Sequence, residues 1–428
     1  MTPRYRVLML SSPRTTWAPA VTLWASSGAV PVECAPCVSV DELLARVDAG
    51  QRWSAALLDG SMPSVDRDVL RRLADRRCPA LVVDDGRVVR DWAGLGAAAR
   101  LSPGFERHEL LDALASSSEP VVSPGAAFVP DPSPVRAGPS GIVLACCGPG
   151  GTGTSTVAAA LAQGCAASGR PTVLLDACLE AEQAMLHDAV EPHAGVQELA
   201  EMHRHGTPPP DHIAAVVMRV ERRDYGLIAG LRRARFWGAV RPTAYAAAVE
   251  SLARYYGAVV IDTDADFETE SDGGSIDVED RTAMARLSVA RADAVFCVGE
   301  PSTKGLHALN RVLVDLANAG VRPERTVPVF NRCVRSARVR SQYVRALADL
   351  TPWRGDDAHP PLFLTARAID DAHRDGSTFP GPMVRALMIG AERAIRTAGG
   401  AAAPEPTPRW QRIVPGELGL RSRSGEVA

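Results

Sequence analysis

Residues 148–156, Gly-Pro-Gly-Gly-Thr-Gly-Thr-Ser-Thr, are the segment of this sequence whose composition and spacing could do chemistry. They follow an apolar strand-like run, GIVLACC, and open a run with helical periodicity. Glycines let the backbone curl so that successive N–H groups and a helix N-terminus converge on an anion. The segment predicts a phosphate-binding turn, although a purely structural strand–helix turn would have the same pattern. The residues expected at the anion are Gly148, Gly150, Gly151, Thr152, Gly153, Thr154, Ser155 and Thr156.

The elements that position this segment alternate between strand-like and helical patterns. After residue 141 the strand candidates are GIVLACC, TVLLDA, YGLIAG, GAVVIDTD, AVFCVGE and TVPVFN. Their apolar residues lie on both strand faces, which implies helices on both sides of a mostly parallel sheet. The sequence predicts a doubly wound α/β fold, in which the loops after the strands share one edge with the glycine-rich segment.

The segment resembles the deviant P-loop of the MinD/ParA family, K-G-G-x-G-K-[ST]-T. Pro149 stands at the first lysine of that motif and Thr154 at the second, so both lysines are replaced. In the family these lysines bind the nucleotide phosphates, one of them across a dimer interface. The resemblance therefore implies a P-loop ATPase-like domain in which ATP and Mg²⁺ binding and hydrolysis are weak or absent.

Further residues match the family pattern in chain order. The resemblance implies that Asp176 helps to organise the attacking water and that Asp262 is the Walker B acid, which holds Mg²⁺ together with Ser155. It also implies that Asn331 reads the adenine edge, with Arg332 beside it. The second aspartate of the family's D-x-D motif is replaced by a cysteine, at residue 178.

Two segments near the expected site depart from the family. The segment after the Walker B acid, residues 262–280, is dense in carboxylates. Arg232, Arg233, Arg235 and Lys304, the single lysine of the chain, lie in loops expected at the same edge. These cations either replace the missing lysines or pair with the acidic segment, and the sequence leaves both uses open.

An N-terminal part has its own βα alternation and resembles a response-regulator receiver domain. Asp59, followed by Gly-Ser-Met-Pro, matches the phosphoacceptor turn, but Ser11 and Ser12 stand where the resemblance requires an acidic pair for Mg²⁺. Phosphoryl transfer to a carboxylate needs a metal and a cation to offset the charge. We therefore expect a degenerate, flavodoxin-like receiver used for docking or dimerisation.

Composition sets the domain organisation and the compartment. The chain has 428 residues, a formal net charge of −3 and nine scattered cysteines. The cysteines favour buried thiols, and the small net charge excludes a whole-molecule electrostatic binder of nucleic acid. The N-terminal run MTPRYRVLML lacks the pattern of a signal peptide, so we expect a cytoplasmic protein. The expected division is a receiver-like domain at 1–116, a Pro- and Ser-rich linker at 117–140, a P-loop domain at 141–397 and a flexible tail at 398–428.

This combination of domains resembles the CpaE/TadZ family, in particular an actinobacterial branch that includes septum-site-determining proteins. The resemblance implies a spatial organiser, a localisation factor for a septum site or for Flp pilus or secretion machinery, which forms homodimers and is recruited to a pole or septum by protein partners. The alternative is an active MinD/ParA-type ATPase that switches between monomer and dimer, with weak DNA binding by the arginine run at residues 332–345. DNA binding is not expected, and the prolines of the tail disfavour the long amphipathic helix that direct membrane insertion would need.

Overall fold

The computed structural model describes residues 5–13, 15–49, 51–87, 89–118, 141–189, 195–269, 276–351, 359–365 and 369–399. The linker expected at 117–140 and the tail expected at 398–428 therefore lie almost entirely outside the described residues. Among the described residues, no helix combines the length and the apolar character that crossing a membrane requires.

The N-terminal part is a five-stranded parallel sheet in the order β2-β1-β3-β4-β5. This is the doubly wound flavodoxin-like order. Alternate residues of β1 pack to opposite faces, with Leu8 and Leu10 on one side and Val7 and Met9 on the other. The elements are β1 (Tyr5–Leu10), α1 (Trp17–Ser26), β2 (Val32–Cys37), α2 (Val40–Asp48), β3 (Ala55–Asp59), α3 (Arg67–Asp75), β4 (Ala80–Val83), α4 (Trp92–Leu95), β5 (Ala99–Leu101) and α5 (Arg107–Ser117).

The C-terminal part is an eight-stranded sheet in the order β13-β12-β11-β6-β10-β7-β9-β8, parallel except for the β8–β9 pair. All six strands expected from the sequence are present, and the α/β fold class is confirmed. The strands are β6 (Ile142–Cys147), β7 (Thr172–Ala177), β8 (Met218–Val220), β9 (Tyr225–Ile228), β10 (Ala258–Thr263), β11 (Ala294–Gly299), β12 (Thr326–Phe330) and β13 (Leu362–Phe363).

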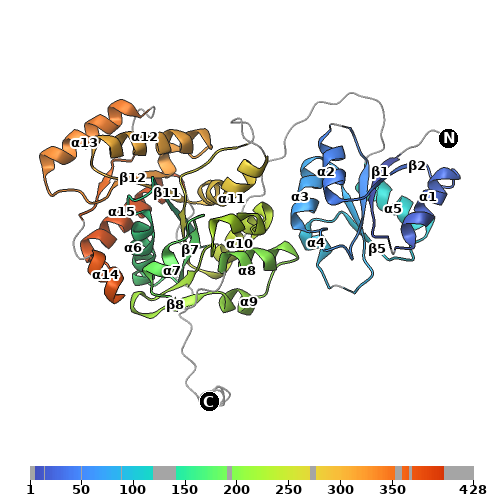
Figure 1. The fold of residues 1–428 in the computed structure, drawn as a ribbon, viewed down its shortest axis with the longest axis horizontal. Helices are drawn as coiled ribbons and strands as arrows, with labels where there is room; N and C mark the ends of the chain where they lie inside the picture. The colour runs from blue at the N-terminus through green and yellow to red at the C-terminus, as the bar shows by residue number, and fades with distance from the viewer. Residues whose placement is uncertain are drawn as a thin grey trace, which may run out of the picture.

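Helices cover both faces of this sheet, as Figure 1 shows. One face carries α8 (Gly195–Arg204), α10 (Pro242–Tyr255), α11 (Ile276–Arg291) and α12 (Thr303–Asn318). The other carries α6 (Thr154–Ala167) and α15 (Gly381–Thr397), which approach closely because α6 is rich in alanine and has Gly164 where a Cβ would lie 2.7 Å from Met388. The remaining helices are α7 (Gln183–Leu186), α9 (Pro210–Ala215), α13 (Ala337–Leu350) and α14 (Ile369–Asp375), with short 3-10 turns at Glu221–Arg223, Ala234–Ala239 and Pro323–Arg325.

The two sheets are joined by contacts of α3 with α8 and α10 (Figure 1). Arg204 of α8 forms an ion pair with Asp66, the N-cap of α3, which is 1% exposed. Arg67 donates to the carbonyl oxygens of His203 and Gly206, and the backbone N–H of Thr243 donates to Asp68. The first turn of α3, in the N-terminal part, thus contacts α8 and α10 of the C-terminal part.

Candidate functional site

The glycine loop, residues 148–153, connects β6 to α6 at the carboxyl edge of the larger sheet. A side chain at Gly148 would place its Cβ 2.3 Å from the carbonyl oxygen of Val298, so only glycine fits there. Gly151 and Gly153 have φ angles of 80° and 85°, in the left-handed region that glycine adopts readily. The strand–loop–helix geometry expected from the sequence is therefore present.

The threonines of this region bond within the protein. The hydroxyl of Thr152 donates to the carbonyl oxygen of Pro149 at 2.7 Å and lies 3.2 Å from that of Thr154. The hydroxyl of Thr156 pairs with Nε2 of His373, which stands on α14. Thr154, which stands at the second lysine of the family motif, thus contacts a hydroxyl of the loop, that of Thr152.

Asn331 and Arg332 hold the glycine loop from the side of β12. Asn331 is 2% exposed, and its Nδ2 donates to the carbonyl oxygen of Thr152 at 2.9 Å. Its Oδ1 accepts from the backbone N–H of Arg332, whose guanidinium donates to the carbonyl oxygen of Gly151 and to Glu300. The structure therefore brings both predicted residues to the loop, as supports of its backbone, while adenine recognition by Asn331 stays a prediction.

Asp176 and Asp262 end two neighbouring strands and are register partners of β7 and β10. Asp176 is fully buried and its carboxylate accepts from the backbone N–H groups of Cys178 and Gln183. Asp262 is 1% exposed. Burial, with a further contribution from the neighbouring acidic groups, raises the pKa of Asp176 to about 6 and that of Asp262 to about 8.

Gln183 is the site residue that the sequence analysis missed. It opens α7, is fully buried, and its Nε2 donates to Oδ2 of Asp262 at 2.7 Å and to the carbonyl oxygen of Ser155 at 2.9 Å. A neutral amide thus bridges the predicted Walker B acid and the first turn of α6. No motif marks this glutamine, and its only signal in the sequence is its place seven residues after Asp176.

The cations proposed as lysine substitutes are not brought to the glycine loop. Arg232, Arg233, Arg235 and Lys304 are exposed, and among the described residues no hydrogen bond or ion pair joins them to the loop. The other use left open, pairing with the acidic segment, is also absent from the described part of that segment, where Asp266 pairs with Arg281. In the part of the chain that the structure describes, the cation that contacts the loop is Arg332, which donates to the carbonyl oxygen of Gly151.

These residues do not fit Mg²⁺·ATP chemistry. Oδ2 of Asp262 is held by the neutral amide of Gln183, and among the described residues no lysine or arginine forms an ion pair with Asp176 or Asp262. Hydrolysis requires positive charge at the transferred phosphoryl oxygens. The described site retains the backbone of a phosphate loop but lacks the lysines that bind the nucleotide phosphates in the family motif.

Other predicted features also have definite places. Asp59 is 3% exposed and accepts from the backbone N–H groups of Ser12 and Ser61 and from the Ser61 hydroxyl. All nine cysteines are free.

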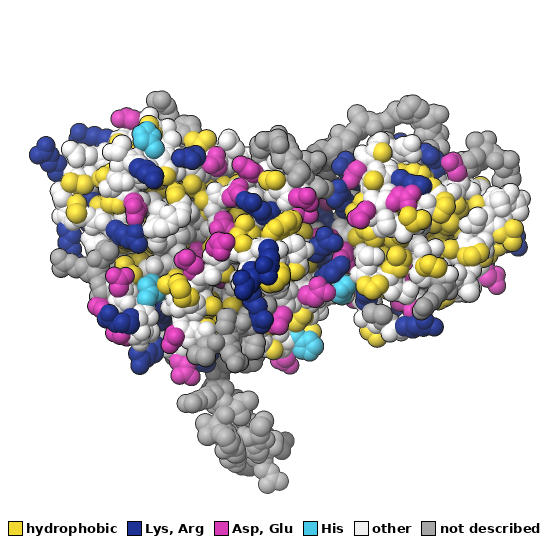
Figure 2. All heavy atoms as spheres, in the orientation of Figure 1, with side chains coloured by type: hydrophobic (Ala, Val, Ile, Leu, Met, Phe, Trp, Pro, Cys, Tyr) yellow, Lys and Arg dark blue, Asp and Glu magenta, His cyan; other side chains and the backbone are white. Residues whose placement is uncertain are grey.

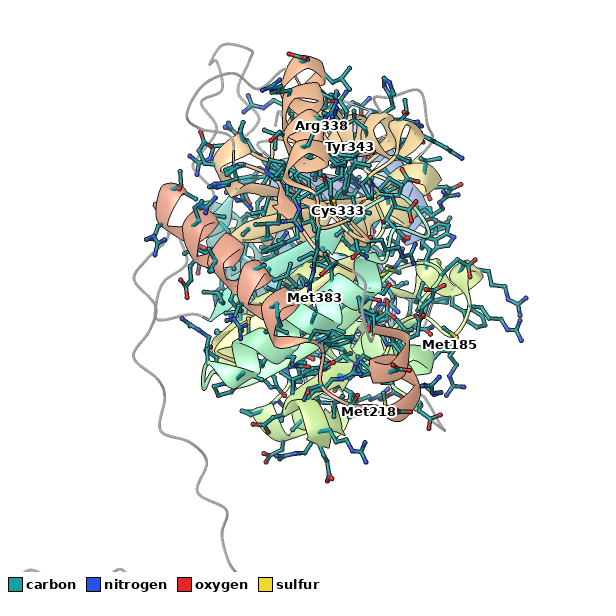
Figure 3. All side chains as sticks on the ribbon, turned by 90° about the vertical axis from the view of Figure 1, so that its left-hand side faces the viewer. Met185, Met218, Cys333, Arg338, Tyr343 and Met383 are labelled. Atoms are coloured by element: carbon teal, nitrogen blue, oxygen red, sulfur yellow. The ribbon has the colours of Figure 1, made fainter. Side chains whose placement is uncertain are left out.

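The arginine run lies mostly on α13. Figure 3 labels Arg338 on α13 and Met185 on α7, and the two helices are well separated in this view. Figure 2 shows basic and acidic side chains interspersed on the face it draws.

Comparison with known proteins finds similar folds only. No protein-family model and no curated protein matches the chain. Solved structures similar to it include a ParA family ATPase from Chlorobium tepidum, with 14% identity over 61% of this chain and 99% of the other, at a TM-score of 0.45. Another is the septum site-determining protein MinD complexed with Mg-ADP from Pyrococcus horikoshii, with 18% identity over 60% and 94% of the two chains, at a TM-score of 0.41. McdA of Cyanothece is similar at 17% identity over 59% and 99%, with a TM-score of 0.43. At this similarity the neighbours carry no argument about function, and the P-loop NTPase-like α/β fold rests on the strand order and the glycine loop themselves.

Proposed function

We propose that the protein is a MinD/ParA-like spatial organiser whose degenerate nucleotide site gives weak or no ATP hydrolysis. In this proposal it is a CpaE/TadZ-like localisation factor for a septum site or for Flp pilus or secretion machinery. The main observation behind the proposed loss of ATP hydrolysis is the Gln183 amide, which donates to the Asp262 carboxylate and to the carbonyl oxygen of Ser155. An organiser that does not hydrolyse ATP needs the shape and surfaces of the fold, and it does not need the lysines.

The architecture supports a docking role. The receiver-like part has a buried, fully hydrogen-bonded Asp59, so that this residue serves the fold of its turn. Its α3 is engaged by α8 and α10, which leaves the α1 and α5 side of its sheet for other contacts. We propose that the chain acts in the cytoplasm as a homodimer through its P-loop face and is recruited by protein partners, without direct DNA or membrane binding.

The alternative is an active ATPase that cycles between monomer and dimer. Its support is the retained backbone of the glycine loop, with Gly151 and Gly153 in left-handed conformations. Main-chain N–H groups at a helix N-terminus attract anions without any lysine. This reading requires that Gln183 leaves Asp262 when nucleotide enters.

Phosphate release separates the two functions. The wild-type chain is compared with a Ser155→Ala/Asp262→Ala variant in the presence of ATP and Mg²⁺, and nucleotide binding is followed in parallel with a labelled ATP analogue. We expect equal background release from both. Turnover by the wild type above this control would establish the ATPase and contradict the proposal.

The localisation role has its own test. A fluorescent fusion of the full chain is expected to form foci at a pole or division site in its native host, and the Ser155→Ala/Asp262→Ala fusion is expected to form the same foci. A uniform distribution of the wild-type fusion at native expression would contradict the organiser role, whatever the result of the phosphate assay.

A further inference from the structure

We propose that Asp176, Cys178 and Asp262 form a binding site for a thiophilic divalent cation, with Zn²⁺ as its representative. We call these three residues the acid–thiol cluster. It differs from the Mg²⁺ position implied by the P-loop resemblance, which uses Ser155 and Asp262, because it depends on the sulfur that replaces the family's second aspartate. The proposal does not rest on the proposed function, since a structural cation and a lost ATPase activity are independent properties.

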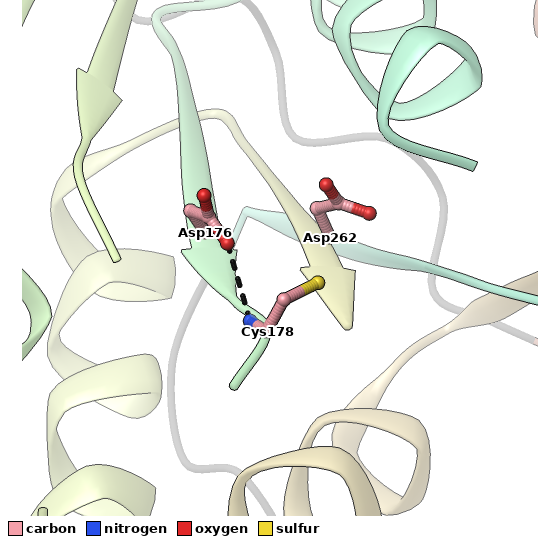
Figure 4. A group of neighbouring side chains, drawn as sticks. All are labelled: Asp176, Cys178 and Asp262. Atoms are coloured by element: carbon pink, nitrogen blue, oxygen red, sulfur yellow. Dashed lines mark hydrogen bonds between the residues drawn. The ribbon is translucent and has the colours of Figure 1, made fainter. Parts of the chain in front are cut away.

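The sheet places the three groups together. Asp176 and Asp262 are register partners at the ends of β7 and β10, and Cys178 follows Asp176 as the chain leaves the sheet (Figure 4). One ligand atom from each of the three lies within 4.8 Å of the other two. Around a tetrahedral zinc ion, bond lengths of about 2.0–2.3 Å put neighbouring ligand atoms about 3.5 Å apart. A movement of the ligand atoms by about an ångström, through rotation of their side chains, would bring them to the separations found around such an ion.

Unsatisfied buried atoms adjoin the cluster. Oδ1 of Asp262 has no hydrogen-bond partner, although the residue is only 1% exposed. Oε1 of the fully buried Gln183 is also without a partner, while Nε2 of the same amide donates to Oδ2 of Asp262. Buried polar atoms are normally paired in native folds, so a fold that leaves these two oxygens unpaired needs a reason to do so. A cation bound by Oδ1 gives that reason for Asp262.

The charges around the cluster call for a positive partner. A further acid, Asp264, accepts from the backbone N–H of Leu179, the residue after Cys178. No described arginine or lysine forms an ion pair with any member of the cluster. Buried charges are normally paired or coordinate a metal. A divalent cation would neutralise the charge of the cluster.

The ligand set selects the kind of cation. Mg²⁺ prefers oxygen ligands in an octahedral shell and keeps several waters, whereas a thiolate favours Zn²⁺, Cd²⁺ or Co²⁺. The backbone N–H groups of Cys178 and Gln183 already orient the Asp176 carboxylate, which is the second layer of support found around metal ligands. The cluster is therefore preorganised on the Asp176 side before a cation arrives.

The test titrates the purified, metal-stripped full chain with Cd²⁺ and follows the ultraviolet charge-transfer absorption of a cadmium thiolate, with Zn²⁺ affinity measured by calorimetry. We expect saturation at one equivalent, competition by Zn²⁺ and no competition by Mg²⁺. Cys178→Ser should remove the absorption, and Asp262→Asn should weaken Zn²⁺ binding at least about tenfold.

Cys34→Ser is the matched control, because Cys34 is the other partly exposed cysteine and should leave both signals unchanged. Thermal unfolding without metal verifies that each variant folds, and added Zn²⁺ should raise the melting temperature of the wild type but not of Cys178→Ser. The proposal is overturned if the wild type shows no charge-transfer band. It is equally overturned if the band survives in Cys178→Ser or disappears in Cys34→Ser.

Discussion

Nε2 of Gln183 lies 2.7 Å from Oδ2 of Asp262 and bridges it to the carbonyl oxygen of Ser155. Replacing Gln183 by Ala leaves two buried acceptors unpaired and opens a cavity, so we expect a loss of about 2–4 kcal/mol in the free energy of unfolding. Urea denaturation measures it. Gln342→Ala, on the exposed face of α13, is the control and should cost less than about 0.5 kcal/mol. A loss as small for Gln183 would show that the bridge does not stabilise the fold.

A double-mutant cycle tests the support of the glycine loop by Asn331. A Cβ on Gly153 would lie 2.5 Å from Nδ2 of Asn331, and the φ of +85° adds backbone strain. Gly153→Ala should cost more than Gly169→Ala, because Gly169 has a φ of +84° but open space around its Cβ. In an Asn331→Ala background the steric part of the Gly153→Ala cost should vanish, giving a coupling energy of about 1 kcal/mol. Strictly additive losses in urea would mean that the two residues do not contact.

The Arg204–Asp66 ion pair is expected to stabilise the docking of α3 on α8. Asp66 is buried and Arg204 is a quarter exposed, so Arg204→Ala should cost about 1–3 kcal/mol in the free energy of unfolding. The exposed pair of Arg219 and Asp224 is the matched control, and Arg219→Ala should cost less than about 1 kcal/mol. Asp66→Asn, which keeps the helix cap, should make the Arg204→Ala loss smaller. Equal losses for the two arginines would contradict a role of this pair in docking.

Acid should destabilise the same interface through His203. Burial, with the charges of Arg67 and Arg254, lowers the pKa of His203 to about 4. The unfolded chain therefore binds a proton on this residue at a higher pH than the folded chain does, so its stabilising contribution is complete above about pH 6.5 and falls by about 1.4 kcal/mol per unit as the pH drops toward 4. Urea titrations between pH 7 and 4.5 should show a shallower loss in His203→Gln. An unchanged slope would assign the acid sensitivity to other groups.

Asp59 should not accept a phosphoryl group. Its carboxylate is buried and accepts three hydrogen bonds, and Ser11 and Ser12 stand where a metal-binding acidic pair would be needed. Incubation with acetyl phosphate and Mg²⁺, followed by intact mass measurement, should leave the chain unmodified while an active receiver in the same tube gains a phosphoryl group. A mass increase that disappears in Asp59→Asn would restore the phosphoacceptor role.

Local pattern was enough to predict the strands that carry the site. Runs of apolar residues bounded by turn residues predicted β6, β7, β9, β10, β11 and β12, because strands buried on both faces are long and continuous in sequence. β8 and β13 were missed, since three and two residues at the sheet edges give no such run. The sequence also did not predict that Arg232 and Arg235 are exposed, because the position of a residue in a loop does not fix the direction of its side chain.

The sequence by itself determined the glycine loop, the replacement of its lysines by Pro149 and Thr154, and the acids at the ends of β7 and β10, because each depends on neighbouring residues and on strand order. Only the tertiary structure decided what faces those acids. Gln183 is 79 residues from Asp262 along the chain, and its amide meets that carboxylate because β7 and β10 are paired and Asp176 fixes the turn before α7. Contacts between such distant residues depend on packing, which no local pattern encodes.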